Sequence, residues 1–332
     1  MKRDAEYVVG VDLGGTNVRA AVVGRDEQIK GQARNPSDAK NGAPRVVAQT
    51  VATVRQAVED AGLAVEQIGA VGMAVPGHIE PRRGLIIWSP NFGETVDGLF
   101  RMFLDVPFGE PVGEQLGVPV VMGNDANVAA LGEFRYGAGR HIDDMVMLTL
   151  GTGIGSGVIT GGHLIIGATG GAVEFGHHAI VAGGLQCGCG NFGCLEAYCG
   201  TQPILERALR LMESGRPTLL TEKAGRHGSG LTPKIIDEAA REGDEVAIQV
   251  WRETGYYLGI GIGNAVNIFN PALVVIGGGI RKATGLLETA DRVMRRRAVD
   301  SAASVCRIVE AGLGEDAGVM GAAELAWRHI QS

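Results

Sequence analysis

The sequence lacks an excess of basic residues, and this sets a first limit on what the protein binds. Its 332 residues include 30 lysines and arginines against 37 aspartates and glutamates, a formal net charge of −7. An acidic chain is poorly suited to nucleic acid or to an anionic membrane surface. We therefore expect neither as a partner, although a small anion can still bind at a local cluster of donors.

The sequence also lacks a segment with the character of a membrane span. Two long stretches, 145–173 and 254–280, contain no Asp, Glu, Lys or Arg. The first holds nine glycines and is typical of strands and turns, and Asn270-Pro271 interrupts the second. Because a spanning helix is a continuous apolar segment, we expect no membrane insertion. No secretory signal is recognisable either, since a strand-like segment follows the first few residues directly.

Cysteine is scarce but concentrated. Four of the five cysteines fall within residues 187–199. The odd number and the missing export signal indicate the cytoplasm, where clustered cysteines bind metal more often than they form disulfides. Taken alone, the cluster leaves three roles open: metal ligands, reactive thiols or a disulfide staple.

The length of the chain allows two domains, and strands that alternate with helices indicate an α/β fold. Two strand–turn–strand units, at 7–23 and 145–160, resemble each other and predict a duplicated, two-lobed architecture with a cleft. Apolar runs predict further strands at 68–75, 118–122, 272–276 and 304–309. Helical spacing predicts helices at 44–61, 125–136, 206–213, 233–241, 244–269, 286–297 and 316–330.

Three glycine-rich turns follow predicted strands, at 12–16, 151–157 and 277–279. Such turns suggest nucleotide phosphates, because residues without Cβ let backbone N–H groups approach an anion. No GxxxxGK[ST] sequence occurs, which excludes a P-loop enzyme. The GxGxxG pattern fails at Ser156 in the second turn and at Lys282 after the third, which argues against a Rossmann dehydrogenase.

Asp12 ends an apolar run that predicts a buried strand, where a carboxylate is costly to desolvate unless it is paired or near a cation. An aspartate that bonds its own backbone in the turn explains DLGG equally well in isolation. Together with a second Gly/Thr turn, a Mg²⁺-nucleotide site is the better explanation, since Mg²⁺ often needs only one or two carboxylates plus phosphates. Thr16 and Thr152 offer hydroxyls to the same phosphates.

Asn124-Asp125 follows a predicted strand and opens a predicted helix. Both residue types are favoured helix N-caps, which is the simpler explanation. Since the carboxyl ends of strands in open α/β sheets face the ligand crevice, Asp125 is also a candidate to accept a proton from a substrate hydroxyl.

Glu174, His177 and Glu196 stand out as polar groups in weakly charged surroundings. Acids and amides suit the hydroxyls of a sugar, which both donate and accept hydrogen bonds. A solvated surface turn explains Glu174 and His177 equally well.

Seven stretches together resemble the ROK family (repressors, open reading frames and kinases), within the actin/hexokinase/Hsp70 superfamily. They are DLGGTN (12–17), AVPGHI (74–79), NDAN (124–127), LGTGIGSG (150–157), EFGHH (174–178), CGCGNFGCLE (187–196) and VIGGGI (275–280). The resemblance implies a two-lobed, duplicated actin-like ATPase (ribonuclease H-like) α/β fold with a central cleft and a zinc-bound loop. It implies a small lobe at 1–136, a large lobe at 137–314 and a C-terminal helix, 315–332, that packs back on the small lobe.

The resemblance also implies a glucokinase-like sugar kinase that transfers phosphate from ATP to the 6-hydroxyl of a hexose, most readily glucose. Asp125 matches the general base of the family. The matching sugar-binding positions are Gly77, Asn91, Asn124, Asp125, Glu174, His177 and Glu196. The matching nucleotide positions are Asp12, Gly14, Gly15, Thr16, Asn17, Gly151, Thr152, Gly153, Gly277 and Gly278. The cofactors implied are ATP with Mg²⁺ and a structural Zn²⁺, and the assembly implied is a homodimer or homotetramer.

By the same resemblance the zinc ligands are His177, Cys187, Cys189 and Cys194. A Cys₃His set is closed and tetrahedral, which suits a structural zinc. Idle reduced thiols, or Cys199 in place of one ligand, are the alternatives. Cys199 and Cys306 otherwise match nothing in the family and are expected to be ordinary buried thiols.

The sequence departs from the glucokinase pattern after Asn91. Many members have a tryptophan shortly downstream, whereas here Trp88 precedes Asn91 and none follows until Trp251. The choice of hexose therefore stays open, and a kinase of N-acetylglucosamine or N-acetylmannosamine is the nearest alternative. A sugar-responsive ROK regulator without a DNA-binding domain is the alternative from another class, because too few residues precede the first strand for a helix-turn-helix.

Overall fold

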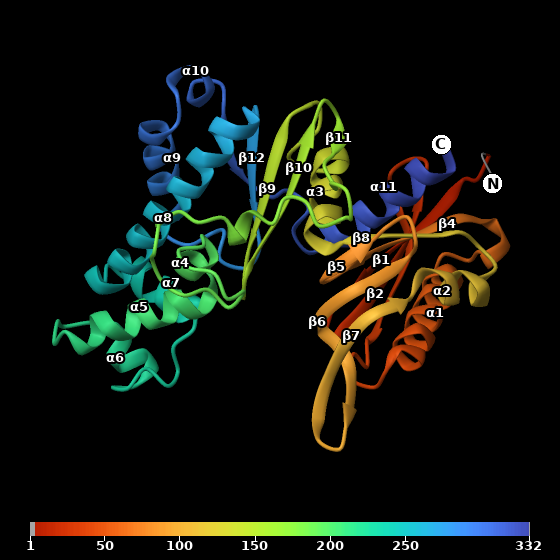
Figure 1. Ribbon diagram of the computed structural model, residues 1–332, viewed down its shortest axis with the longest axis horizontal. Helices are drawn as coiled ribbons and strands as arrows, with labels where there is room; N and C mark the ends of the chain where they lie inside the picture. The colour runs from red at the N-terminus through yellow and green to blue at the C-terminus, as the bar shows by residue number, and fades with distance from the viewer. Residues whose placement is uncertain (1–3, 332) are drawn as a thin grey trace.

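The computed structural model describes residues 4–331, which form two α/β lobes side by side (Figure 1). The first lobe is built on a five-stranded sheet in the order β3-β2-β1-β4-β8. Its strands are β1 (Tyr7–Leu13), β2 (Asn17–Gly24), β3 (Ile29–Pro36), β4 (Ile68–Val75) and β8 (Val120–Asn124). Strands β1, β2 and β3 are antiparallel, and β1, β4 and β8 are parallel.

The second lobe repeats this arrangement. Its sheet has the order β11-β10-β9-β12-β13, again with three antiparallel strands followed by parallel ones. The strands are β9 (Met145–Leu150), β10 (Ile154–Thr160), β11 (His163–Leu164), β12 (Leu273–Gly277) and β13 (Arg307–Glu310). The sequence prediction of two related units is therefore confirmed at the level of strand order and direction.

Helices cover both sheets. In the first lobe, α1 (Ala43–Asp60) packs on β2 and β3, and α2 (Gly109–Leu116) packs on β8. The second lobe carries α4 (Glu196–Cys199), α5 (Thr201–Glu213), α6 (Leu219–Ala224), α7 (Pro233–Arg241), α8 (Glu245–Phe269), α9 (Leu286–Arg297) and α10 (Asp300–Ala303). Single 3₁₀ turns lie at Val65–Gln67, Phe175–His177 and Gly314–Asp316.

Two helices lie between the sheets. They are α3 (Asp125–Tyr136) and α11 (Ala317–Gln331), which pack against each other (Figure 1). Their backbones approach closely, because a Cβ on Gly132 would lie 2.5 Å from the carbonyl oxygen of Ala317 and one on Gly321 would lie 1.8 Å from that of Val128. Helix α11 also packs on β1 and β4, so the end of the chain returns to the first lobe.

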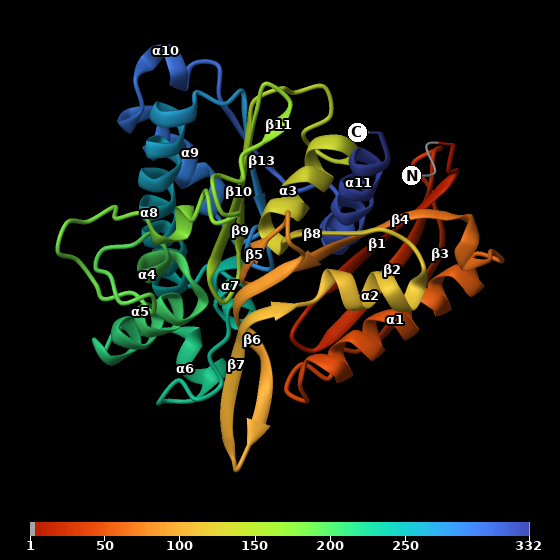
Figure 2. The same cartoon turned by 45° about the vertical axis from the view of Figure 1, so that its right-hand side comes forward.

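A separate three-stranded sheet was not predicted from the sequence. It consists of β5 (His78–Glu80), β6 (Leu85–Val96) and β7 (Leu99–Pro107), and the β6–β7 hairpin extends beyond the body of the first lobe (Figure 2). Its turn is Asp97-Gly98, with φ of 52° and 77°, the conformation that two-residue hairpin loops favour. The register shifts between Ser89 and Gly93, so this part of β6 bulges out of the ladder.

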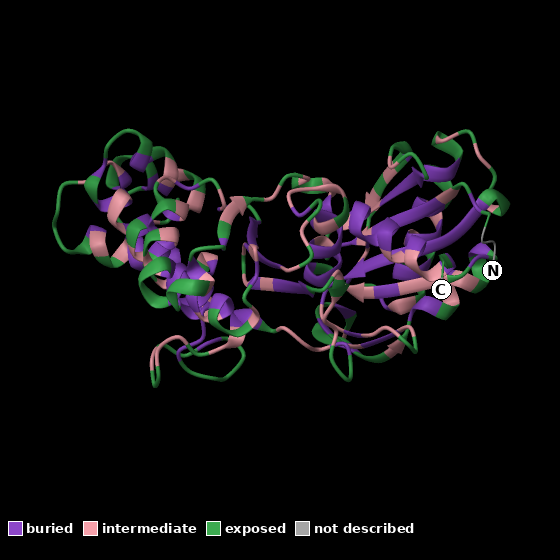
Figure 3. Ribbon diagram, turned by 90° about the horizontal axis from the view of Figure 1, so that it is seen from above, coloured by how far each residue is buried: buried purple, intermediate pink, exposed green. Residues whose placement is uncertain are grey.

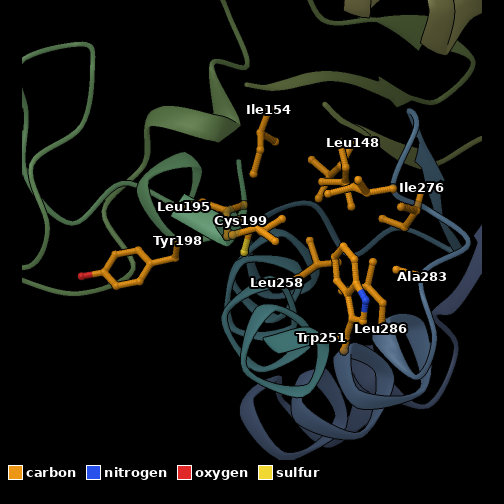
Figure 4. Packing of buried hydrophobic residues seen from close by; sticks show 14 of the residues in the cluster. Leu148, Ile154, Leu195, Tyr198, Cys199, Trp251, Leu258, Ile276, Ala283 and Leu286 are labelled. Carbon is orange, nitrogen blue, oxygen red and sulfur yellow. The ribbon is translucent and has the colours of Figure 1, made fainter. Parts of the chain in front are cut away.

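Each lobe has its own hydrophobic core. Figure 3 shows buried residues concentrated in the strands of both sheets and on the inner faces of the helices. In the second lobe, Trp251 of α8 packs with Leu258, Leu286 and Ile276, and Cys199 lies in the same cluster (Figure 4). These cores hold the glycine turns at the strand ends in place.

The strand β3 and the helices α2 and α6 were not predicted either, and the main remaining departures lie near helix ends. The predicted strand at 304–309 begins only at Arg307, because residues 300–303 form the short helix α10. Helix α5 begins at Thr201, five residues earlier than predicted, because the small residues Gly200 and Thr201 obscure the helical spacing there. Within residues 4–331 no helix is both long and apolar enough to cross a membrane.

Candidate active site

Asp125 is the first residue of α3 and directly follows β8. The preceding Asn124 caps the helix: its Oδ1 accepts hydrogen bonds from the backbone N–H of Ala126 (3.0 Å) and Asn127 (3.2 Å). The Nδ2 of Asn124 donates to the carbonyl oxygen of Gly77 at 3.0 Å. The sequence allowed either Asn124 or Asp125 to cap the helix, and the structure shows that Asn124 is the cap. The Asp125 carboxylate therefore faces the cleft.

Burial raises the pKa of the Asp125 carboxyl, while hydrogen bonds from the Ala126 N–H and from Asn124 lower it in part. A carboxylate whose pKa is raised is a better proton acceptor than an ordinary aspartate. The start of a helix also places the carboxylate in the positive field of the backbone amides. The helix field thus opposes the effect of burial on the pKa and favours the ionised form, which is the form that accepts a proton.

Asp12 lies at the end of β1, close to Asp125. Burial and the charge of Asp125 raise the pKa of the Asp12 carboxyl to about 6, and Arg19 offsets part of this rise. Arg19 is itself engaged, since its guanidinium bonds Asp316 at 2.7 Å and the carbonyl oxygen of Glu315. Two acids this close are costly without a cation between or beside them. The carboxylate of Asp12 therefore fits a Mg²⁺ ligand.

Of the two predicted phosphate loops, the second, residues 151–153, lines the larger cavity of the cleft, whereas the first, residues 14–17, lines neither central cavity and reaches the cleft only where Gly15 meets Asn91. In the first, the Gly14 N–H donates to the carbonyl oxygen of Asn17 at 2.9 Å, and Gly15 lies against the Asn91 side chain. In the second, the Gly151 N–H donates to the Gly153 carbonyl at 3.0 Å, and Thr201 bonds the Gly151 carbonyl through both its N–H and its hydroxyl. Thr16 and Thr152 are exposed, so their hydroxyls are available to a ligand.

The third glycine turn follows β12 and needs glycine. Gly278 has a φ of +85°, and a Cβ there would lie 2.0 Å from the carbonyl oxygen of Leu150. Gly278 thus allows the turn after β12 to approach the end of β9, where the second phosphate loop begins. The neighbouring Gly279 has no such constraint, since a Cβ there would meet no atom within 4 Å.

Adjoining cavities occupy the cleft. The smaller, of about 260 Å³, is lined by Asp12, Asp125, Gly277, Gly278 and Arg281. The larger, of about 400 Å³, is lined by Gly77, Asn91, Asp125, Gly151, Thr152, Gly153 and Glu196. Asp125 lines both. A third, of about 260 Å³, lies on the far side of Gly279 between α7, Trp251 and Lys282. Together they form a path from Asn91 past Asp125 to the third glycine turn.

The bulge in β6 explains how Asn91 enters the cleft. The shift between Ser89 and Gly93 takes residues 90–92 out of the ladder, Phe92 is buried beneath it, and Asn91 lines the larger cavity. Bulges commonly re-aim a side chain in this way.

The cysteine cluster is assembled as the resemblance implied. One ligand atom from each of His177, Cys187, Cys189 and Cys194 lies within 4.8 Å of the others. The Nδ1 of His177 lies 3.7 Å from Cys187 Sγ, and the sulfurs of Cys189 and Cys194 are 3.8 Å apart. None of these thiols is in a disulfide. Three thiols and one imidazole in this arrangement match the donor set of a structural zinc site.

Glu196 links the cysteine cluster to the second phosphate loop. Its Oε2 accepts a hydrogen bond from the backbone N–H of Ile154 at 2.8 Å, and its Oε1 lies 3.9 Å from His177 Nδ1 and 3.7 Å from Cys187 Sγ. Any displacement of the cysteine loop therefore reaches both the larger cavity and the loop at Gly151–Gly153.

Cys199 is not part of the cluster. It is fully buried, its Sγ lies 3.5 Å from the carbonyl oxygen of Thr254, and burial raises the pKa of its thiol to about 12. Cys306 is also buried, with a thiol pKa raised to about 11 by burial. Both are unreactive core thiols, as expected from the sequence, and the alternative with Cys199 as a ligand is not supported.

Not every expected residue lines the cleft cavities. Glu174 is exposed before the turn at Phe175–His177, His177 faces the cysteine cluster, and Asn124 lies behind Asp125. Sequence reasoning also missed residues that do line them, namely Arg281, Glu315 and Gly318. Arg281 is the second residue after the third glycine turn and was a detectable signal. Gly318 could not be recognised from the sequence, because only the return of α11 brings it to the site. A Cβ on Gly318 would lie 2.8 Å from the Asp12 carboxylate.

Comparisons with known proteins agree with this geometry. The chain is 34% identical to a glucokinase of Thermotoga maritima over 327 residues, covering 97% of this chain and 98% of the relative. It matches the structure of a ROK family glucokinase from Streptomyces griseus in complex with glucose and AMPPNP, with a TM-score of 0.78, 34% identity and coverage of 97% and 99%. It is 31% identical to the Escherichia coli repressor Mlc over 224 residues, covering 67% of this chain but 52% of the repressor.

The family model for ROK proteins matches residues 8–329. That range includes both phosphate loops, Asp125, the cysteine cluster and the third glycine turn. The expectation drawn from the seven motifs is therefore confirmed: the chain belongs to the ROK family.

Proposed function

We propose that this protein is a glucokinase-like enzyme that transfers the γ-phosphoryl group of ATP to the 6-hydroxyl of a hexose, with glucose as the preferred sugar. The observation that carries the proposal is the position of Asp125. Its carboxylate lies at the start of a helix and lines both central cavities, one shared with the glycine loop at 151–153 and the other with the glycine turn at 277–278. The similarity to glucokinases over nearly the whole chain supports the choice of reaction.

The sugar occupies the larger cavity in this proposal. Asn91 and the backbone around Gly77 bind its hydroxyls on the first lobe, and Glu196 binds them on the second. Asp125 accepts the proton of the 6-hydroxyl as that oxygen attacks the γ-phosphorus. Glu174 and His177 are proposed to complete the sugar site when the lobes close, since they lie outside the cavities of the present conformation.

The nucleotide lies along the remaining path. The backbone N–H groups of Gly15 and Gly153, with the hydroxyls of Thr16 and Thr152, bind its phosphates, while the N–H groups of Gly14 and Gly151 close the two turns. The turn at Gly277–Gly278 and the cavity bounded by Lys282 and Trp251 receive the adenosine. Asp12 holds Mg²⁺, which neutralises charge on the phosphates and leaves the chain to align the reacting groups.

The proposed zinc is structural. His177, Cys187, Cys189 and Cys194 use all four tetrahedral positions, so none is open to a substrate. The metal would hold the loop that carries Glu196 and thereby stabilise both the sugar cavity and the second phosphate loop. The chemistry would remain with Asp125 across the cleft.

The proposed lobes divide at residue 136, with 137–314 as the large lobe and 315–332 returning to the small one. The packing of α11 on β1, β4 and α3 supports this division. We place the protein in the cytoplasm, where a hexose kinase meets ATP and where five unpaired cysteines remain reduced.

An ADP-release assay tests the function. Purified protein with MgATP is given glucose, N-acetylglucosamine, N-acetylmannosamine, mannose and fructose in turn. Glucose-dependent ADP release that disappears in Asp125→Asn is the expected result. Faster turnover of an N-acetylhexosamine than of glucose would make that sugar the preferred substrate. No turnover of any sugar would overturn the kinase proposal in favour of a sugar-responsive regulator.

A further inference from the structure

Glu133, in the last turn of α3, is a fully buried carboxylate that bonds to backbone alone. Its Oε2 accepts hydrogen bonds from the N–H of Ala138 at 2.8 Å and of Gly312 at 3.0 Å. Its Oε1 accepts one from the N–H of Leu313 at 2.7 Å. Among residues 4–331 no ion pair of Glu133 is found, and its hydrogen bonds come from backbone donors.

These donors belong to the two connections between the lobes. Ala138 lies in the segment 137–144, which joins α3 to β9, and Gly312 and Leu313 lie in the segment 311–316, which joins β13 to α11 (Figure 1). Residues 133 and 313 are 180 positions apart in the sequence. One carboxylate thus ties together both places where the chain passes from one lobe to the other.

The same helix carries the proposed base. Glu133 follows Asp125 by eight residues, about two turns or 12 Å along α3. The helix also contacts the second lobe, because a Cβ on Gly157 would lie 2.5 Å from the Ala130 side chain and one on Gly155 would lie 2.7 Å from that of Ala126. A shift of α3 at its Glu133 end therefore moves Asp125 against the phosphate loops.

We propose that Glu133 is a positioning residue: it fixes α3 to both interlobe connections, so that Asp125 meets the sugar hydroxyl when the lobes close. Hinges absorb backbone rotation at a few residues, and a clamp across both connections restricts that rotation to one axis. The kinetic part of this inference rests on the proposed kinase function. The clamp itself does not.

Glu133→Gln is the test variant, because glutamine keeps the shape but offers one acceptor oxygen in place of two. Glu324→Gln is the matched control. Glu324 is also buried and lies in α11, but it bonds side chains: the Tyr136 hydroxyl at 3.1 Å, Arg328 Nε at 2.9 Å and Arg135 Nε at 3.7 Å. Glu133→Asp, shorter by one methylene, is expected to reach one connection and to show an intermediate effect.

Hydrogen–deuterium exchange tests whether Glu133 holds the two connections, and steady-state kinetics test whether it positions Asp125. In Glu133→Gln, exchange should rise at 137–144, at 311–316 and at the first turn of α3. The kcat should fall by about 10- to 100-fold, because a misplacement of about 1 Å is costly in an aligned site, while the glucose Kd changes by less than about threefold. Glu324→Gln should keep wild-type kcat and wild-type exchange at 311–316, even where its melting temperature falls.

Three outcomes would overturn the inference. Unchanged exchange at 311–316 in Glu133→Gln removes the clamp. Raised exchange with wild-type kcat, or an equal loss of kcat in Glu324→Gln, removes the positioning role. If the wild-type chain phosphorylated no sugar, the proposed function would fail separately, and exchange at 125–128 in Glu133→Gln would still decide whether the clamp orients the start of α3.

Discussion

Replacing Asp12 with asparagine is expected to stabilise the ligand-free protein while abolishing its activity. Burial, then the charge of Asp125, raises the pKa of the Asp12 carboxyl from 3.8 to about 6. Because the folded-state pKa exceeds the unfolded one, the folded protein holds the proton more tightly. Stability is thus fully present below about pH 4 and is lost as the pH rises through 6. At 1.36 kcal/mol per unit, ionised Asp12 costs about 3 kcal/mol at neutral pH.

Asparagine has nearly the same shape without the charge, so Asp12→Asn should recover up to about 3 kcal/mol at pH 7.5 and about half of that at pH 5. The assay is urea unfolding followed by tryptophan fluorescence, without nucleotide or metal. Asp144→Asn is a control of opposite sign, because the Thr160 hydroxyl and the Gly161 N–H hold the pKa of Asp144 below its usual value. That variant should lose stability toward neutral pH. A variant Asp12→Asn no more stable than wild type at pH 7.5, or one still active with MgATP, refutes the reasoning.

Three further variants test other parts of the site. Asp125→Asn should lower kcat by about 10²- to 10⁴-fold with glucose binding retained, measured by ADP release and calorimetry; comparable turnover would exclude Asp125 as the base. Cys189→Ser should lose bound zinc in elemental analysis, whereas Cys306→Ser should keep it. Because Cys189 is exposed, its replacement should leave the core intact, and equal zinc content in the two variants would show that the cysteine cluster is not the zinc site. Gly278→Ala should destabilise by at least about 2 kcal/mol in thermal unfolding, whereas Gly279→Ala should be near neutral; similar melting temperatures would contradict the close approach to Leu150.

Much of the fold was predictable because its elements carry strong local signals. The strand–turn–strand unit at 7–23 became β1 and β2, and the apolar run at 68–75 became β4 with the predicted bounds. The helices predicted at 125–136, 233–241 and 286–297 became α3, α7 and α9. Glycine turns at the ends of buried strands marked the two phosphate loops. The repetition of such a unit predicted a duplicated architecture, and the two sheets indeed share one strand order.

The β6–β7 hairpin was missed although its turn is visible in the sequence. Asp97-Gly98 between alternating residues is a strong hairpin signal, and its positive φ angles are the ones that such a turn requires. The bulge that turns Asn91 into the cleft has no comparable signal, since nothing local distinguishes residues 90–92 from a regular strand. Recognising Asn91 depended on the family motif, and its position depended on the fold.

The sequence by itself determined the class of the protein: an α/β chain with paired glycine turns, an acid at the end of a strand and a Cys/His cluster, in the order of the ROK family. These features are local, because turns, caps and metal-ligand types are written in neighbouring residues. Tertiary structure decided the division of roles. It assigned the helix cap to Asn124 and the free carboxylate to Asp125, brought Gly318 against Asp12, and gave Glu133 donors 180 residues away. Such relations depend on how two lobes and their connecting helices pack, and no local pattern encodes them.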